Sequence, residues 1–143
     1  MFGRNNKLDT GWLSRIGFFE GFSESELAAV SSLGERTEVS AGSEIIDQGR
    51  VGDSCYVIVD GTADVYIRGE FVTTVGPGSM VGEMALVGHR PRNATVTAHT
   101  EMVLVEFGTD EFRRLLDASP NAKAKVDGLL QARVAANRQR DEE

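Results

Sequence analysis

The sequence predicts a mainly β domain, with a small barrel or jelly roll at its centre and helices on both sides. Two observations lead to this fold class. Glycine recurs at short intervals between Glu35 and Phe107, and the runs between the glycines are short and rich in valine, isoleucine and threonine. Short strands separated by turns at this spacing are typical of β-barrels and jelly rolls. Helical patterns occur before and after this region.

The N-terminal helices are expected over about residues 10 to 34. The apolar residues of their first part are Trp12, Leu13, Ile16, Phe18, Phe19 and Phe22. Ser23 precedes Glu26 by three residues, which is the spacing of a capping box ahead of an apolar run. We therefore expect a short helix over about residues 24 to 32, with its end near Gly34.

The strands of the β-roll are expected between about residues 35 and 108. The strand-like runs cover residues 56–59, 63–67, 71–75, 95–98 and 102–107. Polar and apolar residues alternate along residues 63–68, as they do in a half-buried strand. Asp60-Gly61 predicts a two-residue hairpin turn, and Arg68-Gly69-Glu70 predicts a second tight turn.

The C-terminal helices are expected over about residues 109 to 139. Thr109 or Asp110 is the predicted cap of the first helix, which Pro120 interrupts. Asn121 is the predicted cap of the second helix, which should run through about Gln139. Gly128 weakens this second helix by ~1 kcal/mol relative to alanine.

Length and composition set broad limits. The 143 residues, 41% hydrophobic and 26% charged, suit an ordinary globular protein that forms one domain over residues 1–143. No apolar stretch approaches the roughly 18 residues of a membrane-spanning helix, and no apolar signal core follows the N-terminal basic residues. We therefore expect no membrane partner and a cytoplasmic location. The single cysteine, Cys55, lies in an apolar run and should be a buried, inert thiol.

The charge argues against nucleic acid as a partner. The net charge is −7 and the pI about 4.9, whereas broad nucleic-acid binding needs a basic surface. Two histidines and one cysteine supply no metal-ligand cluster, and no serine lies in a recognisable nucleophile motif, so we expect neither a metal site nor catalysis. The basic residues of the last helix are expected to form a solvated face, with a partner-binding helix as the alternative. They are Lys123, Lys125, Arg133, Arg138 and Arg140.

The segment from Gly82 to Val96 carries the most specific chemistry. Residues 83–87 read as one turn of helix, and the free amides and dipole at the start of a helix favour an anion. Nine residues after Glu83 comes Arg92, whose guanidinium can donate two parallel hydrogen bonds to a phosphate. An acid beside an arginine suits a ligand with both a hydroxyl and an anion, as in a cyclic nucleotide. Taken alone, such a Glu–Arg pair is more often a structural ion pair.

This segment resembles the phosphate-binding cassette of cyclic nucleotide-binding domains, the family of bacterial catabolite activators, kinase regulatory subunits and gated channels. The matching residues are Gly82-Glu83-Met84-Ala85-Leu86 and Arg92-Asn93-Ala94-Thr95-Val96. The resemblance extends over about residues 13 to 139. It implies a jelly roll of the double-stranded β-helix type with flanking N-terminal helices and two C-terminal helices, a hinge and a lid.

The resemblance implies roles for individual residues of the cassette. Glu83, next to Gly82, would bind the ribose 2′-hydroxyl, and Arg92 would bind the cyclic phosphate. The phosphate cradle would be completed by Met84, Ala85, Asn93 and Ala94, chiefly through backbone amides. After the arginine, family members often carry alanine, serine or threonine, and a hydroxyl there can help to select guanine. The amide of Asn93 can donate or accept, so it does not decide between adenine and guanine. We expect cAMP as the ligand, with cGMP as the alternative.

Other predicted contacts lie outside the cassette. The lining of the sugar and base would come from Val65, Thr73, Val75 and Val81. The lid that caps the base would use Leu130, Arg133 or Val134. Leu86 would pass ligand binding to the hinge helix near Phe112 and Leu115.

The expected function is that of a stand-alone, non-enzymatic sensor. Binding of cAMP or cGMP would shift the C-terminal helices and change the surface seen by a protein partner. Two alternatives are a non-binding interaction domain of the same fold and a regulatory fragment of a larger channel, kinase or transcription factor. Met1 and the charged tail suggest a whole chain, and the acidic balance argues against an attached DNA-binding unit.

Overall fold

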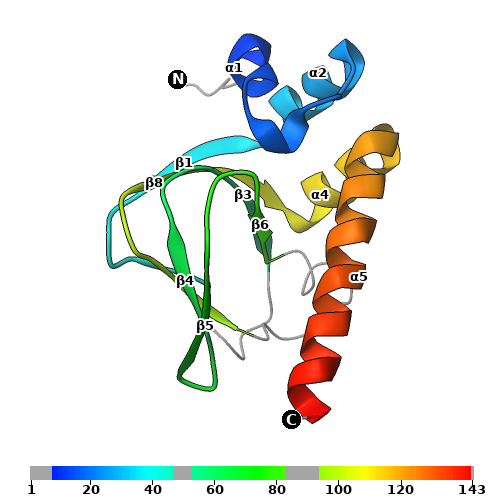
Figure 1. Cartoon of the computed structure of the whole chain (residues 1–143). Helices are drawn as coiled ribbons and strands as arrows, with labels where there is room; N and C mark the ends of the chain where they lie inside the picture. Colours follow the sequence, from blue (N-terminus) through cyan, green and yellow to red (C-terminus); the bar gives the residue numbers. More distant parts are fainter. Residues whose placement is uncertain (1–7, 47–52, 83–93, 143) are drawn as a thin grey trace.

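Two four-stranded antiparallel sheets form the centre of the molecule (Figure 1). The computed structural model describes residues 8–46, 53–82 and 94–142, with side chains as far as residue 135. The first sheet has the order β1 (Glu35–Val39), β8 (Met102–Gly108), β3 (Ser54–Asp60) and β6 (Met80–Val81). The second sheet has the order β2 (Glu44–Ile46), β7 (Thr95–Ala98), β4 (Ala63–Ile67) and β5 (Glu70–Val75). This mainly β, jelly-roll-like architecture confirms the predicted fold class.

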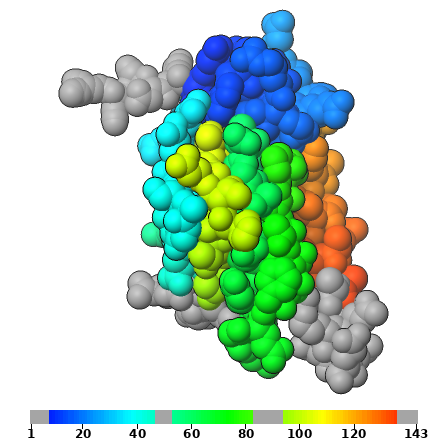
Figure 2. Space-filling view, turned by 60° about the vertical axis from the view of Figure 1, so that its left-hand side comes forward, coloured from blue at the N-terminus to red at the C-terminus, as the bar shows by residue number. Residues whose placement is uncertain are grey.

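Helices cover one end and one side of the two sheets. They are α1 (Thr10–Ser14), the 3₁₀ helix η1 (Gly17–Phe19), α2 (Glu24–Leu33), α4 (Thr109–Ala118) and α5 (Pro120–Glu142). The N-terminal helices close one end of the roll, and α5 runs along its side (Figure 1). Figure 2 shows strand residues from distant parts of the sequence side by side beneath the N-terminal helices.

The five predicted strands are present, and the described residues contain three further strands. β4 and β7 have the predicted bounds, and the other predicted strands are longer by one to three residues. The additional strands are β1, β2 and β6. β1 has a largely polar and exposed sequence, and the other two have only three and two residues. Strands this short or this polar show no alternating pattern, so they carry no sequence signal.

The predicted hairpin at Asp60-Gly61 is wrong. β3 pairs with β6 and β8 in the first sheet, whereas β4 pairs with β5 and β7 in the second. Gly61 and Thr62 therefore carry the chain from one sheet to the other. Turn residues determine the local backbone shape, but the choice of strand partner depends on which faces are buried together. The turn after β4 does form a hairpin, because Arg68 and Gly69 adopt φ values of 55° and 80°, as a two-residue type I′ turn requires.

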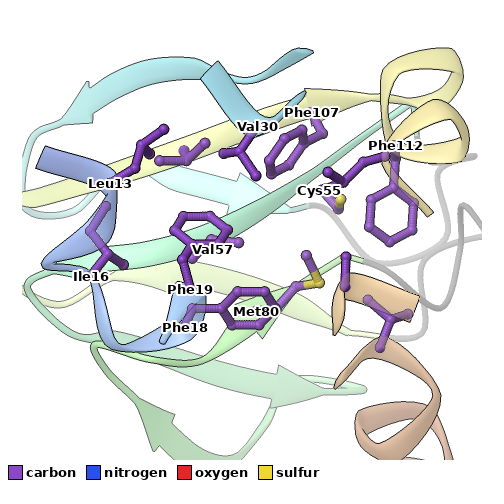
Figure 3. Packing of buried hydrophobic residues seen from close by; sticks show 14 of the residues in the cluster. Leu13, Ile16, Phe18, Phe19, Val30, Cys55, Val57, Met80, Phe107 and Phe112 are labelled. Atoms are coloured by element: carbon purple, nitrogen blue, oxygen red, sulfur yellow. The ribbon is translucent and has the colours of Figure 1, made fainter. Parts of the chain in front are cut away.

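Buried apolar side chains form two clusters. The first joins the helices to the first sheet (Figure 3), and its labelled members include Phe18, Val57, Met80 and Phe107. Cys55 belongs to this cluster and is fully buried, which confirms the predicted buried thiol. The second cluster takes side chains from both sheets, and its buried members are Ile46, Ile58, Ala63, Val81, Val96, Ala98, Met102 and Leu104. The face of the second sheet that meets this cluster also carries part of the predicted ligand lining.

The capping box of α2 is confirmed. The hydroxyl of Ser23 accepts a hydrogen bond from the amide of Glu26 at 3.2 Å, and the Glu26 carboxylate accepts one from the amide of Ser23 at 2.8 Å. The cap predicted for α4 is wrong, because the helix begins at Thr109 and Gly108 is its N-cap without a side-chain hydrogen bond. The hydroxyl of Thr109 donates instead to the carbonyl of Asp53 at 3.4 Å, so it is turned away from the start of the helix.

The cap predicted for α5 is also wrong. The helix begins at Pro120, whose fixed φ suits the first helical position. The hydroxyl of Ser119 accepts a hydrogen bond from the amide of Ala122 at 3.0 Å, so Ser119 caps the helix. The side chain of Asn121 is used elsewhere, because its amide nitrogen donates to the Glu26 carboxylate at 2.7 Å.

Replacement of Gly61 by alanine is expected to destabilise the fold by about 2–3 kcal/mol, because left-handed backbone and a steric clash act together. Gly61 has φ +88°, and a Cβ there would clash with the carbonyl oxygen of Glu101. Gly42 is a matched control, since its φ is +90° but a Cβ there would meet no atom within 4 Å. Gly42→Ala should therefore lose only about 1 kcal/mol. Equal losses in urea unfolding of the two variants would contradict the predicted clash.

Candidate functional site

Most of the predicted cassette contacts lie outside the described residues. The predicted cassette contacts in the range 83–93 are Glu83, Met84, Ala85, Leu86, Arg92 and Asn93. The structure describes the two ends of the segment, Gly82 and Ala94. These ends, the predicted lining residues and the predicted lid residues can therefore be placed.

The two ends of the segment belong to different sheets. β6 ends at Val81, which pairs with Tyr56 of β3 in the first sheet. β7 begins at Thr95, which pairs with Tyr66 of β4 in the second sheet. The chain thus leaves one sheet at Gly82 and returns on the other after Ala94. Both ends of the predicted cassette are therefore attached to paired strands, the short edge strand β6 and the inner strand β7.

Gly82 has a backbone conformation that favours glycine. Its φ is +91°, in a region that residues with a Cβ adopt only with strain. The residue directly before Glu83 therefore requires glycine for its backbone shape. The part that Gly82 plays in binding a ligand stays a prediction.

The predicted lining residues come from both sheets and share one region. Val65 and Thr73 are opposite each other in the register of β4 and β5, and Val75 is opposite Ala63. Val65 and Val75 are partly buried against the second cluster, and Val81 is a buried member of it from the first sheet. Thr73 is exposed, although its register partner Val65 is not. The structure thus brings three of the four residues to one apolar cluster, and their contact with a ligand stays a prediction.

The predicted lid residues are in three different environments. Leu130 is partly buried and packs against the first cluster, whereas Val134 is 41% exposed. Arg133 reaches back to the roll, where its Nη2 donates a hydrogen bond to the carbonyl of Met80 at 2.6 Å. Met80 lies two residues before Gly82, so α5 contacts the strand that leads directly into the cassette.

The expected solvated face of the last helix is wrong for Arg133. Arg133 donates a hydrogen bond to the Met80 carbonyl. Lys125 is partly buried as well, and its Nζ lies 5.0 Å from the ring centroid of Phe18. Lys123 is exposed, with 65% of its side chain accessible, as predicted. The side chains of Arg138 and Arg140 lie outside the described residues. Long basic side chains can pack their stems on apolar surface, so positive charge on a helix does not by itself predict exposure.

The predicted hinge residues are part of the core. Phe112 and Leu115 of α4 are both 2% exposed and belong to the first cluster. Leu86, their predicted contact in the cassette, lies outside the described residues. The structure therefore shows where Phe112 and Leu115 lie, and their contact with Leu86 stays a prediction.

Glu26 is a buried charged residue, and the sequence predicted only one of its hydrogen bonds. It is 5% exposed and accepts hydrogen bonds from the Ser119 hydroxyl at 2.6 Å and from the Asn121 side-chain amide at 2.7 Å. It also accepts hydrogen bonds from the backbone amides of Asn121 at 3.0 Å and of Ser23 at 2.8 Å. The capping-box spacing revealed the bond to Ser23. The bonds to Ser119 and Asn121 span 93 and 95 residues and leave no local signal.

These hydrogen bonds lower the pKa of Glu26 from 4.5 to about 2. The hydroxyl of Ser119 makes the largest contribution, followed by the backbone of Ser23 and the side chain of Asn121, while burial acts in the opposite direction. Each donor stabilises the ionised carboxylate more than the neutral acid. Glu26 is therefore charged at neutral pH although it is buried.

Within residues 8–46, 53–82 and 94–142, no group of three or more histidine, cysteine, aspartate or glutamate side chains is arranged to hold a metal ion. Over the same residues, no helix combines the length and the apolar character needed to cross a membrane.

The chain matches the sequence model of a known protein family. The sequence model of the family described as "Cyclic nucleotide-binding domain" matches residues 36–119. This is more than half of the 143 residues and includes the whole segment from Gly82 to Val96. The chain belongs to this family. The resemblance seen in the sequence is thereby confirmed, and the roles of single residues in this cyclic nucleotide-binding domain stay predictions.

Solved structures of similar fold include three from different organisms. The catabolite activator protein of Thermus thermophilus has a TM-score of 0.76 and 22% identity, over 88% of this chain and 62% of that chain. The regulatory domain of Toxoplasma gondii PKA, co-crystallised with cAMP, has a TM-score of 0.73 and 22% identity, over 86% and 48%. A cyclic nucleotide-binding-like protein of Brucella abortus has a TM-score of 0.62 and 32% identity, over 76% and 97%. The cyclic nucleotide-binding domain thus spans less than two thirds of the first two proteins.

Proposed function

We propose that this domain binds a 3′,5′-cyclic nucleotide at the segment from Gly82 to Val96, with cAMP as the preferred ligand. The observation that carries the proposal is the pair of elements Gly-Glu-x-Ala-Leu and Arg-x-Ala-Thr-Val inside the residues that the family model matches. The positive φ of Gly82 and the attachment of the segment to both sheets support it. A cAMP complex is known for the similar regulatory domain from Toxoplasma gondii.

In the proposed complex, two charged side chains bind different groups of the ligand. Arg92 donates two parallel hydrogen bonds to the cyclic phosphate, which are stronger than bonds between neutral groups. Glu83 accepts a hydrogen bond from the ribose 2′-hydroxyl, and the amides of Met84, Ala85 and Ala94 complete the phosphate cradle. A net charge of −7 does not prevent this, because distant charges are screened within about 10 Å at ordinary salt.

The proposed role is regulatory and non-enzymatic, and it takes place in the cytoplasm. A ligand that binds one arrangement of the C-terminal helices better than another shifts the equilibrium between them. The link from Arg133 to the Met80 carbonyl supports such coupling, because it joins α5 to the strand before the cassette. A protein partner then reads the position of α5. The same domain can serve this role alone or within a larger channel, kinase or transcription factor.

The test is calorimetry of the full chain with cAMP, cGMP and 5′-AMP. We expect cAMP to bind most tightly, cGMP more weakly, and 5′-AMP not measurably, because its open phosphate carries a different charge and shape. Mass spectrometry of small molecules released from the denatured protein shows beforehand whether the site is already filled. If titration with cAMP and cGMP releases no heat of binding, and neither nucleotide changes the melting temperature, the chain is a non-binding interaction domain instead.

A further inference from the structure

In the described part of the chain, each sheet ends in two edge strands, and three of these four are protected against pairing with another chain. The edges are β1 and β6 of the first sheet and β2 and β5 of the second. β2 and β6 have only three and two residues. β1 is rich in charge, and the guanidinium of Arg36 lies 2.9 Å from the carboxylate of Glu38. Short length and charge are common protections of an edge strand.

β5 is the longest of these edge strands and carries little charge. It has six residues, and its one charged residue is the first, Glu70. Four of the six residues are exposed, and Phe71 is 58% exposed. Figure 1 shows the turn between β4 and β5 at the end of the roll opposite the N-terminal helices. The edge of β5 therefore combines backbone that is paired on one side only with an exposed aromatic side chain, and a further strand would cover both.

A bulge at Val72 determines how the side chains of β5 are directed. Tyr66 is opposite Phe71 and Val65 is opposite Thr73, so Val72 is an extra residue of β5. The rings of Phe71 and Tyr66 are in edge contact, with centroids 5.9 Å apart. Bulges are common at sheet edges, where they interrupt the ladder and turn a side chain in a new direction. The residue beside this bulge is the exposed Phe71.

The bulge also makes β5 a match for a second copy of itself. By their partners in β4, Phe71 and Thr74 lie on one face of the sheet, and Glu70 and Val75 lie on the other. Antiparallel pairing of two copies about the middle of the strand places Phe71 opposite Thr74 and Glu70 opposite Val75. Residues directly opposite in an antiparallel pair share a face, so the faces agree. Without the extra residue, the members of each pair would be on opposite faces.

We propose that β5 is the interface of a symmetric dimer, in which the two copies of β5 pair as antiparallel strands and join the second sheets of both chains into one. Both strands are already ordered, so their pairing loses less conformational entropy than the binding of a flexible peptide. The contact is isologous, and it leaves no open edge at β5 in either chain. The proposal does not depend on the proposed ligand.

Charge and shape at the two ends of β5 favour this arrangement. The two Glu70 carboxylates would be about 17 Å apart along the strands, beyond the roughly 10 Å over which exposed charges interact at ordinary salt. Residues 76–78 of the second copy, which are Gly-Pro-Gly, would come next to the hairpin end, so no long side chain meets it. A hollow of about 610 Å³ offers room there, and it is lined by Ile67, Arg68, Glu70, Phe71 and Val72.

The experiment is sedimentation equilibrium of the full chain over protein concentrations from about 1 to about 300 µM. A stable interface buries at least about 1,200 Å², and one pair of six-residue strands is a smaller contact, so we expect a weak dimer with a Kd of about 10–100 µM. Phe71→Lys places a charge in the contact and should raise this Kd at least about tenfold. Val134→Lys is the matched control, because Val134 is the other exposed large hydrophobic side chain of the described residues and lies on α5. It should leave the Kd unchanged.

Cross-linking tests the alignment of the strands, and it does not rely on the stability of Phe71→Lys. Thr73→Cys introduces an exposed thiol near the centre of the contact, whereas Glu44→Cys introduces one on β2, at the opposite edge of the same sheet. The native Cys55 is fully buried, so a short thiol-specific cross-linker reacts with the introduced cysteines. We expect covalent dimers from Thr73→Cys and none from Glu44→Cys.

Three results would overturn the proposed dimer. A monomer at every concentration would leave the edge of β5 to an extended segment of a different protein. A dimer that Val134→Lys dissociates and Phe71→Lys does not would place the interface on α5. Equal cross-linking of Thr73→Cys and Glu44→Cys would show that the chains meet without the proposed alignment.

Discussion

Arg92→Ala is expected to weaken cAMP binding by at least about 100-fold, since a desolvated phosphate that loses a charged, two-bond partner loses about 3 kcal/mol or more. Arg92 is the proposed main partner of the phosphate. The measurement is calorimetry with cAMP on the wild type and the variant under the same salt conditions. The melting temperature of the variant without ligand shows whether the domain remains folded.

Two further variants test whether the loss of affinity is specific to the guanidinium of Arg92, or whether any positive charge in the segment has the same effect. Arg92→Lys keeps the positive charge but removes the planar pair of donors, so we expect an intermediate loss of affinity. Arg90→Ala is the matched control in the same segment, because Arg90 is also an arginine but lies outside the two elements that match the cassette, Gly82–Leu86 and Arg92–Val96. If Arg90→Ala and Arg92→Ala weaken binding equally, or if neither does, the role proposed for Arg92 is wrong.

Glu26→Ala is expected to destabilise the domain by about 3–5 kcal/mol, because removal of the carboxylate leaves one buried and two partly buried donors without an acceptor. These donors are the hydroxyl of Ser119 and the backbone and side-chain amides of Asn121. Urea unfolding monitored by circular dichroism measures the loss. Glu24→Ala is the matched control, since Glu24 is an exposed residue of the same first turn of α2. It should change stability by about 0.5 kcal/mol at most.

The contribution of Glu26 should also depend on pH in a defined direction. Its pKa is lowered from 4.5 to about 2, so the folded state favours the ionised carboxylate more than the unfolded state does. The stabilisation is therefore fully present above pH 4.5 and is lost as the pH falls toward 2. Glu26→Gln cannot titrate, so the stability difference between wild type and this variant should shrink over that range. A difference that is constant from pH 6 to pH 2.5 would contradict the lowered pKa.

Several parts of the fold could be predicted because their causes are local. The capping box of α2 needs only Ser23 and Glu26, which are three residues apart. The turn at Arg68 and Gly69 needs two residues that accept positive φ. The cassette motif is likewise contained in the fifteen positions from Gly82 to Val96, and it led to the family that the comparison confirmed.

Other parts could not be predicted because several local choices were equivalent. Asp60-Gly61 suits a hairpin and a crossover between sheets equally well, and the crossover forms because β3 and β4 bury their side chains with different partners. Thr109 and Asn121 are good helix caps in isolation. In the folded chain their side chains bond to Asp53 and Glu26, so Gly108 and Ser119 take the cap positions.

The sequence by itself determined the strand-rich centre, the helical ends and the ligand motif with its acid and its arginine. Only the tertiary structure decided which sheet each strand joins, that Glu26 anchors the start of α5, and that Arg133 reaches the strand before the cassette. The physical reason is the range of the interactions. A turn or a cap is stabilised by atoms within a few residues, whereas a buried carboxylate needs donors from wherever the chain brings them, here more than 90 residues away.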